Sequence, residues 1–154
     1  MTLRLIGQKL NMDYHFKQKR KAVFSETDLA GIVHFASFFP YMEDCEHSFY
    51  RSLGYSVTEM TDEEGISIGW PRINVSCEYI KPIRFEEEFD IHLIVSEMTG
   101  KTIRYEFNFF NNEEQLLAKG TVIVVCVKFS DSGMKSVSIP DSIRKTINYS
   151  AFQK

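Results

Sequence analysis

The amino-acid sequence predicts an α+β domain in which an antiparallel β-sheet wraps around one long central α-helix. One stretch of the 154 residues carries apolar side chains at helical spacing, and most of the chain after it alternates apolar and polar residues with a period of two. The helix must bury its apolar stripe, and a sheet is the only other element available to cover it. We expect residues 1–12 to form a flexible extension and residues 13–154 to form a single domain.

The predicted helix covers residues 37–53. Its apolar residues recur at spacings of four, three, four and four: Phe38, Met42, Cys45, Phe49 and Leu53. Polar residues are expected on its other side: Glu43, Asp44, Glu46, His47 and Arg51. Pro40 is tolerated in the first turn, where its missing N–H removes no helical hydrogen bond, and Gly54 supplies the stop.

Strands are predicted on both sides of this helix in the sequence. Residues 14–24 form the first, with a wet face that includes Lys17, Lys19, Arg20 and Lys21. Further strands are predicted at residues 72–79, 89–95, 102–109 and 122–127, the last continuously apolar and therefore expected to be covered on both faces. A short helix is expected after Pro140. One face or edge of the sheet stays uncovered in this layout, which predicts a dimer.

Composition narrows the class of protein. The 18 Lys and Arg against 21 Asp and Glu give a formal charge of −3, which argues against nucleic-acid binding. The three cysteines lie far apart and form no C-x-x-C pair, so we expect a reducing cytoplasm rather than a disulfide framework or a zinc site. No run of about 18 apolar residues is available to span a bilayer.

A candidate catalytic stretch lies just before the predicted helix. It begins with the carboxylate of Asp28, passes through Gly31 and ends at Phe35, where the free N–H groups of a helix start are expected. Such donors can bind the oxyanion that develops on a carbonyl, while the carboxylate attacks that carbonyl or deprotonates a water. These groups suit hydrolysis of a thioester, whose thiolate leaves without a strong general acid. On local sequence alone, a turn or helix-capping role for Asp28 is an equal alternative.

The stretch FSETDLAGIVHFASFFPYMEDCEHSFYRSLG, residues 24–54, resembles the signature of hotdog-fold thioesterases of the 4-hydroxybenzoyl-CoA thioesterase family. In that family, D-x-x-G-(I/V)-(V)-x-(F/Y/H) leads into the central helix, and the order of the later strands is similar over roughly residues 14–147. The resemblance implies an acyl-CoA or acyl-carrier-protein thioesterase of the hotdog fold that needs no metal or other cofactor. It also implies a homodimer or homotetramer with the active site at a subunit interface.

The resemblance assigns roles to individual residues. Asp28 matches the catalytic aspartate, as nucleophile or general base, and Gly31 matches the motif glycine. Phe35 matches the position whose backbone N–H polarises the thioester carbonyl. His34 stands where relatives vary among Tyr, Trp and His. A packed ring with a satisfied nitrogen is therefore the favoured interpretation of His34 over an acid or base role.

Other residues are predicted to bind the substrate. Four residues of or near the motif are expected to contact it: Gly31, Ile32, Val33 and Phe38. A share of the nearby aromatic residues is expected to line an acyl pocket that favours an aromatic or medium-length acyl group: Phe35, Phe38, Phe39 and Trp70. Cations that could bind the phosphates of CoA are Lys81, Arg84 and Lys128.

Three further hypotheses are weighed against this assignment. Glu43 and His47 lie four residues apart on the helix, but no third ligand has suitable spacing, so no metal site is predicted. Cys45 belongs to the apolar stripe and is expected in the core rather than as a nucleophile. A hotdog module that binds acyl thioesters or a carrier protein without hydrolysing them is the alternative function, and retention of Asp28 speaks against it.

Overall fold

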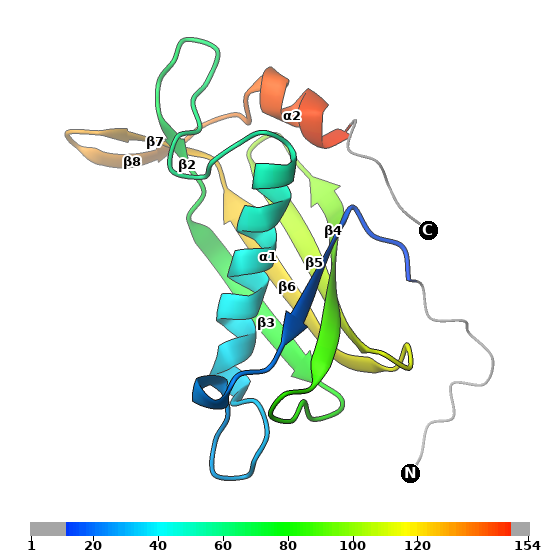
Figure 1. Cartoon of the computed structure of the whole chain (residues 1–154). Helices are drawn as coiled ribbons and strands as arrows, with labels where there is room; N and C mark the ends of the chain where they lie inside the picture. Colours follow the sequence, from blue (N-terminus) through cyan, green and yellow to red (C-terminus); the bar gives the residue numbers. More distant parts are fainter. Residues whose placement is uncertain (1–11, 149–154) are drawn as a thin grey trace, which may run out of the picture.

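A five-stranded antiparallel sheet curves around one long helix, as predicted (Figure 1). The computed structural model describes residues 12–148, so all but the last residue of the predicted extension lies outside the described residues. The helix is α1 (Phe38–Ser52), and the strand order across the sheet is β1-β4-β5-β6-β3. The strands are β1 (Phe16–Lys21), β3 (Arg72–Tyr79), β4 (Glu88–Met98), β5 (Thr102–Asn111) and β6 (Leu116–Val125).

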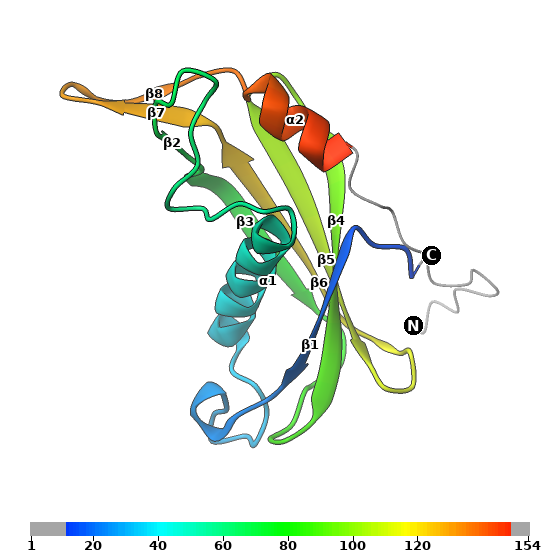
Figure 2. The same ribbon diagram turned by 45° about the horizontal axis from the view of Figure 1, so that its top comes forward.

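A smaller sheet and a second helix lie near the C-terminal end of α1. The small sheet has the strand order β2-β7-β8, and Figure 2 shows its β7–β8 hairpin projecting from the body of the molecule. Its strands are β2 (Ile68–Gly69), β7 (Val127–Ser130) and β8 (Gly133–Ser136). The second helix, α2 (Asp141–Asn148), begins directly after Pro140, as predicted. Within residues 12–148, no helix is long and apolar enough to cross a membrane.

The opposite end of α1 carries the predicted catalytic stretch. Two short 3₁₀ turns, η1 (Phe24–Glu26) and η2 (Phe35–Ser37), frame it, and η2 runs directly into α1. The segment between them forms the loop at the foot of α1 in Figure 1.

The core lies between α1 and the concave face of the sheet. The predicted stripe of α1 is buried from Phe38 to Phe49, and the inward-facing residues of β4 and β5 are fully covered. On β6, Gly120 faces α1, and a Cβ atom there would lie 2.1 Å from the Sδ atom of Met42. The helix can pack this closely only because position 120 has no side chain.

The prediction that Glu46 lies on the polar side of α1 was wrong. Glu46 is 2% exposed and its carboxylate contacts the Arg72 guanidinium of β3 at 3.0 Å. Strand β3 passes beside α1 and covers a second side of the helix, where Tyr50 is also buried. The burial raises the pKa of Glu46 to about 7, although Arg72 acts in the opposite direction.

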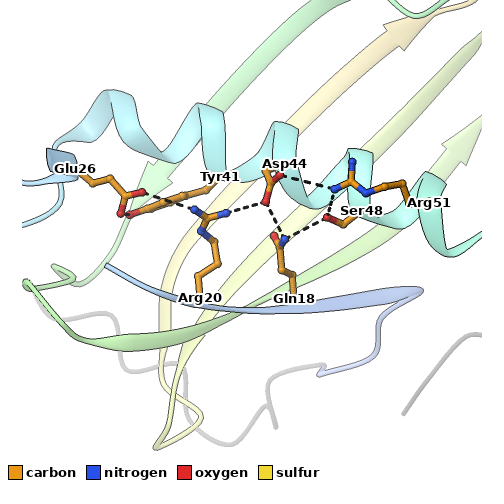
Figure 3. Close-up of polar contacts among 7 residues, drawn as sticks. All are labelled: Gln18, Arg20, Glu26, Tyr41, Asp44, Ser48 and Arg51. Atoms are coloured by element: carbon orange, nitrogen blue, oxygen red, sulfur yellow. Dashed lines mark hydrogen bonds and ion pairs between the residues drawn. The ribbon is translucent and has the colours of Figure 1, made fainter. Parts of the chain in front are cut away.

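Two strand predictions need correction. Strand β6 is an interior strand, but Ile123 and Val125 are only half-buried, because no helix or sheet among residues 12–148 covers them on the outer face of the sheet. In β1, Arg20 does not belong to the wet face, since its guanidinium contacts Asp44 of α1 at 2.8 Å (Figure 3). The alternating lysines of β1 are exposed, as expected.

Candidate active site

Asp28 lies at the turn of a small hairpin formed by residues 27–33, which we call the 27–33 hairpin. Its N–H donates to the carbonyl of Ile32 at 3.0 Å, and its carbonyl accepts the N–H of Gly31 at 3.0 Å. The side-chain Oδ1 accepts the N–H of Ala30 at 2.8 Å. Gly31 has φ = +74°, a conformation that favours glycine. Asp28 is therefore a turn residue and not the cap of α1, and its second carboxylate oxygen has no hydrogen bond to the described residues.

Residues 34–37, the 34–37 turn, leave one backbone donor free. The N–H of His34 donates to the carbonyl of Glu26 at 2.8 Å, and that of Ser37 donates to the carbonyl of His34 at 2.9 Å. The N–H of Ala36 donates to the His34 ring Nδ1 at 3.1 Å. The N–H of Phe35 has no acceptor among residues 12–148. The first donor of η2 is thus the one available to a ligand.

A cleft of about 480 Å³ joins these two elements to the end of β3 and the segment after it. Its lining includes Asp28, Phe35 and Phe38, together with Tyr79 and Lys81. The 27–33 hairpin is joined to the segment after β3, because the N–H of Val33 donates to the carbonyl of Ile83 at 2.7 Å. The lining is mostly apolar, with Asp28 at one wall.

Tyr79 is a site residue that sequence reasoning missed. Its hydroxyl donates to the carbonyl of Phe35 at 2.8 Å, and its ring packs edge-on against Phe38 with centroids 5.0 Å apart. Burial and the neighbouring Cys77 raise the pKa of Tyr79 to about 12, so the hydroxyl keeps its proton. No local pattern indicates this contact, because 44 residues separate its partners.

The structure brings most of the predicted site residues together. Those that line the cleft are Asp28, Ile32, Val33, Phe35, Phe38 and Lys81. Gly31 shapes the hairpin turn instead, and Arg84 forms a β-bridge with Ile32 just outside the cleft lining. Lys128 lies elsewhere, paired with Asp62 at 2.6 Å in a separate cleft beside α2, so the structure does not bring it to this cleft.

His34 acts in the structure as the cap of η2. Its Nδ1 accepts a backbone N–H, and its ring packs on the ring of Phe35 with centroids 4.4 Å apart. This is the packed ring with a satisfied nitrogen that sequence reasoning favoured over an acid or base role.

The metal-site and Cys45 hypotheses concern residues of α1, whose surroundings the structure describes. Within residues 12–148 no three His, Cys, Asp or Glu side chains are grouped as metal ligands. Glu43 contacts Arg72 at 3.4 Å. Cys45 is fully buried, and burial raises the pKa of its thiol far above the usual range, which is the state of a core residue.

Comparison with known proteins places the chain in a family. Residues 22–147 match the family model described as the thioesterase-like superfamily. The chain belongs to that superfamily. Membership confirms both the predicted hotdog fold and the predicted class of enzyme, a thioester hydrolase.

Individual relatives agree with this assignment. A protein of Aquifex aeolicus (strain VF5) with a provisional esterase name is 32% identical over 132 residues, which cover 86% of this chain and 97% of the relative. The acyl-CoA thioester hydrolase YbgC of Escherichia coli O6:H1 is 25% identical over 128 residues, covering 83% and 92%. The similarity therefore extends over nearly the whole length of each relative.

Solved structures show the same fold. The crystal structure of a hypothetical protein from Aquifex aeolicus superposes with a TM-score of 0.74 at 30% identity, covering 86% of this chain and 98% of that one. A 1,4-dihydroxy-2-naphthoyl-CoA thioesterase from Synechocystis gives a TM-score of 0.78 at 19% identity, covering 87% and 96%. The second likeness concerns the fold alone. Membership of the 4-hydroxybenzoyl-CoA branch in particular stays a prediction.

Proposed function

We propose that the protein is an acyl-CoA thioesterase in which Asp28 and the backbone N–H of Phe35 carry out the hydrolysis. One observation carries this proposal: a carboxylate and the one free N–H of the 34–37 turn belong to residues that line the same cleft. Family membership supports the reaction class. A carrier-protein thioester is the alternative form of the same substrate.

The proposed chemistry proceeds from these two groups. The thioester oxygen accepts the N–H of Phe35, which stabilises the charge that develops there by about 3 kcal/mol. Asp28 then acts in one of two ways. As nucleophile, it forms a mixed anhydride with the acyl group and expels the thiolate, and water later cleaves the anhydride. As general base, it takes a proton from a water that attacks the carbonyl directly. Both routes end in a free acid and a thiol.

The cleft wall favours an apolar acyl group. Side chains of Ile32, Val33, Phe38 and Ile83 surround the space between Asp28 and the end of β3. We propose an aromatic or medium-length acyl chain in preference to acetyl, because only a larger group covers this apolar surface. Lys81 lies at the same cleft and is the proposed partner of a CoA phosphate, with Arg84 beside it. Assignment to the 4-hydroxybenzoyl-CoA branch belongs to this proposal.

We also propose a cytoplasmic homodimer or homotetramer with the site at a subunit interface. Strand β3 lies at a sheet edge and exposes Ile73 and Val75, while Leu29 at the tip of the 27–33 hairpin is fully exposed. Exposed apolar groups beside an open strand edge favour association. Three free thiols suit a reducing compartment. Light scattering after size-exclusion chromatography tests the assembly, and a monomer at micromolar concentration would contradict it.

The test of the function is thiol release from a panel of acyl-CoAs with wild type and Asp28→Asn. We expect the substitution to lower kcat by at least about 100-fold, because Asn neither attacks nor accepts a proton. Thermal stability should change little, since Asp28 is exposed. Asp131→Asn, in the exposed β7–β8 turn, is the matched control and should keep full activity.

Equal rates for wild type and Asp28→Asn on a well-hydrolysed substrate would contradict the mechanism. Tight binding of an acyl-CoA that stays intact for hours would instead identify a binding module. A single turnover in ¹⁸O-labelled water tests the covalent route. Unlabelled acid in the first turnover identifies a mixed anhydride that water cleaves at the Asp28 carbonyl. Labelled acid shows that water attacked an acyl carbon, either that of the thioester or that of the anhydride.

A further inference from the structure

Glu26 connects the 34–37 turn to the 27–33 hairpin. Its main-chain carbonyl accepts the N–H of His34 at 2.8 Å and the hydroxyl of Ser37 at 3.1 Å. Both ends of the turn that presents the Phe35 N–H are therefore tied to one carbonyl oxygen. Asp28 follows Glu26 by two residues, so the position of Glu26 also fixes where the 27–33 hairpin begins.

The side chain of Glu26 is held by three residues, one each from the preceding loop, α1 and β1. Its Oε2 accepts the backbone N–H of Val23 at 3.0 Å and the hydroxyl of Tyr41 on α1. Its Oε1 lies 3.7 Å from the guanidinium of Arg20 on β1. Figure 3 shows the carboxylate at the hydroxyl end of the Tyr41 side chain, with a dashed line to Arg20. Because α1 and β1 are regular elements of the core, these contacts connect the irregular segment to rigid structure.

Arg20 and Tyr41, which hold the Glu26 carboxylate, also contact each other and other groups of α1. Arg20 stacks over the ring of Tyr41, with its Cζ 4.8 Å from the centroid, and also contacts Asp44 at 2.8 Å. Tyr41 is 1% exposed, and burial together with Glu26 raises the pKa of its hydroxyl, which therefore stays a hydrogen-bond donor. Figure 3 shows the same network continuing along α1 through Ser48 to Arg51.

Glu26 does not line the 480 Å³ cleft. Its side chain instead borders a separate cleft of about 280 Å³, together with Arg20 and Tyr41. A carboxylate in that place cannot exchange protons with a substrate bound at Asp28. Any effect on the reaction must pass through the backbone that Glu26 holds.

We propose that Glu26 is a positioning residue that sets the place of the Phe35 N–H relative to the Asp28 carboxylate, with Tyr41 and Arg20 as its anchors. This inference rests on the proposed function. A displacement of about 1 Å in such a pair can cost on the order of 100-fold in rate. Loss of the anchor should lower kcat and leave KM nearly unchanged, because the lining of the substrate cleft is not altered.

The test compares Glu26→Ala, Glu26→Gln and Tyr41→Phe by kcat, KM and thermal stability. Gln keeps an acceptor for Val23 and Tyr41 but loses the charge that faces Arg20, so we expect about a tenfold loss of kcat for Ala and a smaller loss for Gln. Tyr41→Phe removes one anchor and should resemble Gln. Glu43→Gln is the matched control, because it neutralises another carboxylate of α1, one that pairs with Arg72 and touches neither Glu26 nor its anchors, and its kcat should stay within about twofold.

Hydrogen exchange of the His34 amide, measured by NMR, provides a readout that does not depend on activity. Weakening the anchor should speed exchange of this amide in Glu26→Gln and Tyr41→Phe, even if Glu26→Ala does not fold. Unchanged His34 exchange and unchanged kcat in folded variants would overturn the proposal. A fall in kcat that Glu43→Gln reproduces would also overturn it, because the effect would then be general destabilisation. Failure of the proposed function has a different signature, namely full activity of Asp28→Asn or an inactive wild type, while His34 exchange still reports on the anchor.

Discussion

The helix–sheet interior and the segment from the 27–33 hairpin to the 34–37 turn are held together by different forces. In the interior, α1 packs on buried apolar residues, and Met42 touches the bare backbone at Gly120. In the proposed catalytic segment, Leu29 and Phe35 are exposed, and the chain is fixed by directional hydrogen bonds to backbone and polar groups. Apolar contact depends on volume, whereas hydrogen bonds depend on position. Stability and catalysis should therefore respond to different substitutions.

The largest expected effect on the catalytic side comes from Phe35→Pro. Proline removes the one free N–H of the turn, and His34, at φ −62° and ψ 139°, already has the conformation favoured before proline. We expect kcat to fall by about 100-fold to 1,000-fold, the usual result of losing one oxyanion donor, with little change in the melting temperature. Thiol-release kinetics and thermal unfolding measure the two quantities.

Phe35→Ala is the control for this substitution. It loses the same exposed ring but keeps the N–H, so kcat should stay within about tenfold of wild type while KM rises with the lost cleft wall. If both variants lose activity equally, the ring and not the N–H matters, and the oxyanion assignment is wrong.

On the interior side, the largest expected effect comes from Gly120→Val. The new Cβ would overlap the Sδ of Met42, which lies 2.1 Å away, so the buried Met42 side chain must move or α1 must shift from the sheet. We expect a loss of about 1–3 kcal/mol in the free energy of unfolding, measured by urea titration. Gly100→Val is the control, because nothing lies within 4 Å of a Cβ at that turn position. Equal stabilities of the two variants would show that α1 is less closely packed than the structure indicates.

Glu46 should make the stability of the interior depend on pH. Burial raises its pKa from the usual 4.5 to about 7, so the folded protein binds this proton more tightly than the unfolded chain does. The contribution is fully present below pH 4.5 and is lost as the pH rises through about 7. Glu46→Gln should flatten this dependence, which is on the order of 2 kcal/mol, and stabilise the protein at pH 8.

Urea titrations at pH 5 and pH 8 measure this difference. Glu43→Gln is the control, because Glu43 also contacts Arg72 but is exposed on the same helix. A pH dependence that persists in Glu46→Gln would assign it to another group. Activity at saturating substrate should be similar in both variants, since neither residue lines the catalytic cleft.

The smallest expected effect belongs to Gly31→Ala. A Cβ there meets nothing within 4 Å, so the whole cost is the φ of +74°, about 1 kcal/mol. Because this strain falls on the hairpin that carries Asp28, kcat should fall by severalfold while the urea midpoint moves slightly. A loss of stability with unchanged kcat would show that the conformation of the hairpin does not affect the reaction.

Short-range patterns in the sequence predicted the central helix and the site segment closely. The spacing from Phe38 to Leu53 located α1 to within a residue at each end, because helical periodicity is a local property. The order of Asp28, Gly31 and Phe35 just before this helix made Asp28 the candidate catalytic carboxylate, and its role stays a prediction. The same local view put Glu46 on the polar side of α1 and Arg20 on the wet face of β1.

Contacts between distant residues decided the rest. Tyr79 reaches Phe35 across 44 residues, and Arg72 reaches Glu46 across 26, distances over which no periodicity carries information. No sequence pattern distinguishes Glu26 from other polar loop residues. Only the packing of β1 against α1 places Arg20 and Tyr41 around it. Apolar spacing was enough to determine which elements form, because each element buries its own stripe. How the sheet curves around the helix decided which polar groups meet between those elements, including the contacts of Arg20 and Tyr41 with Glu26.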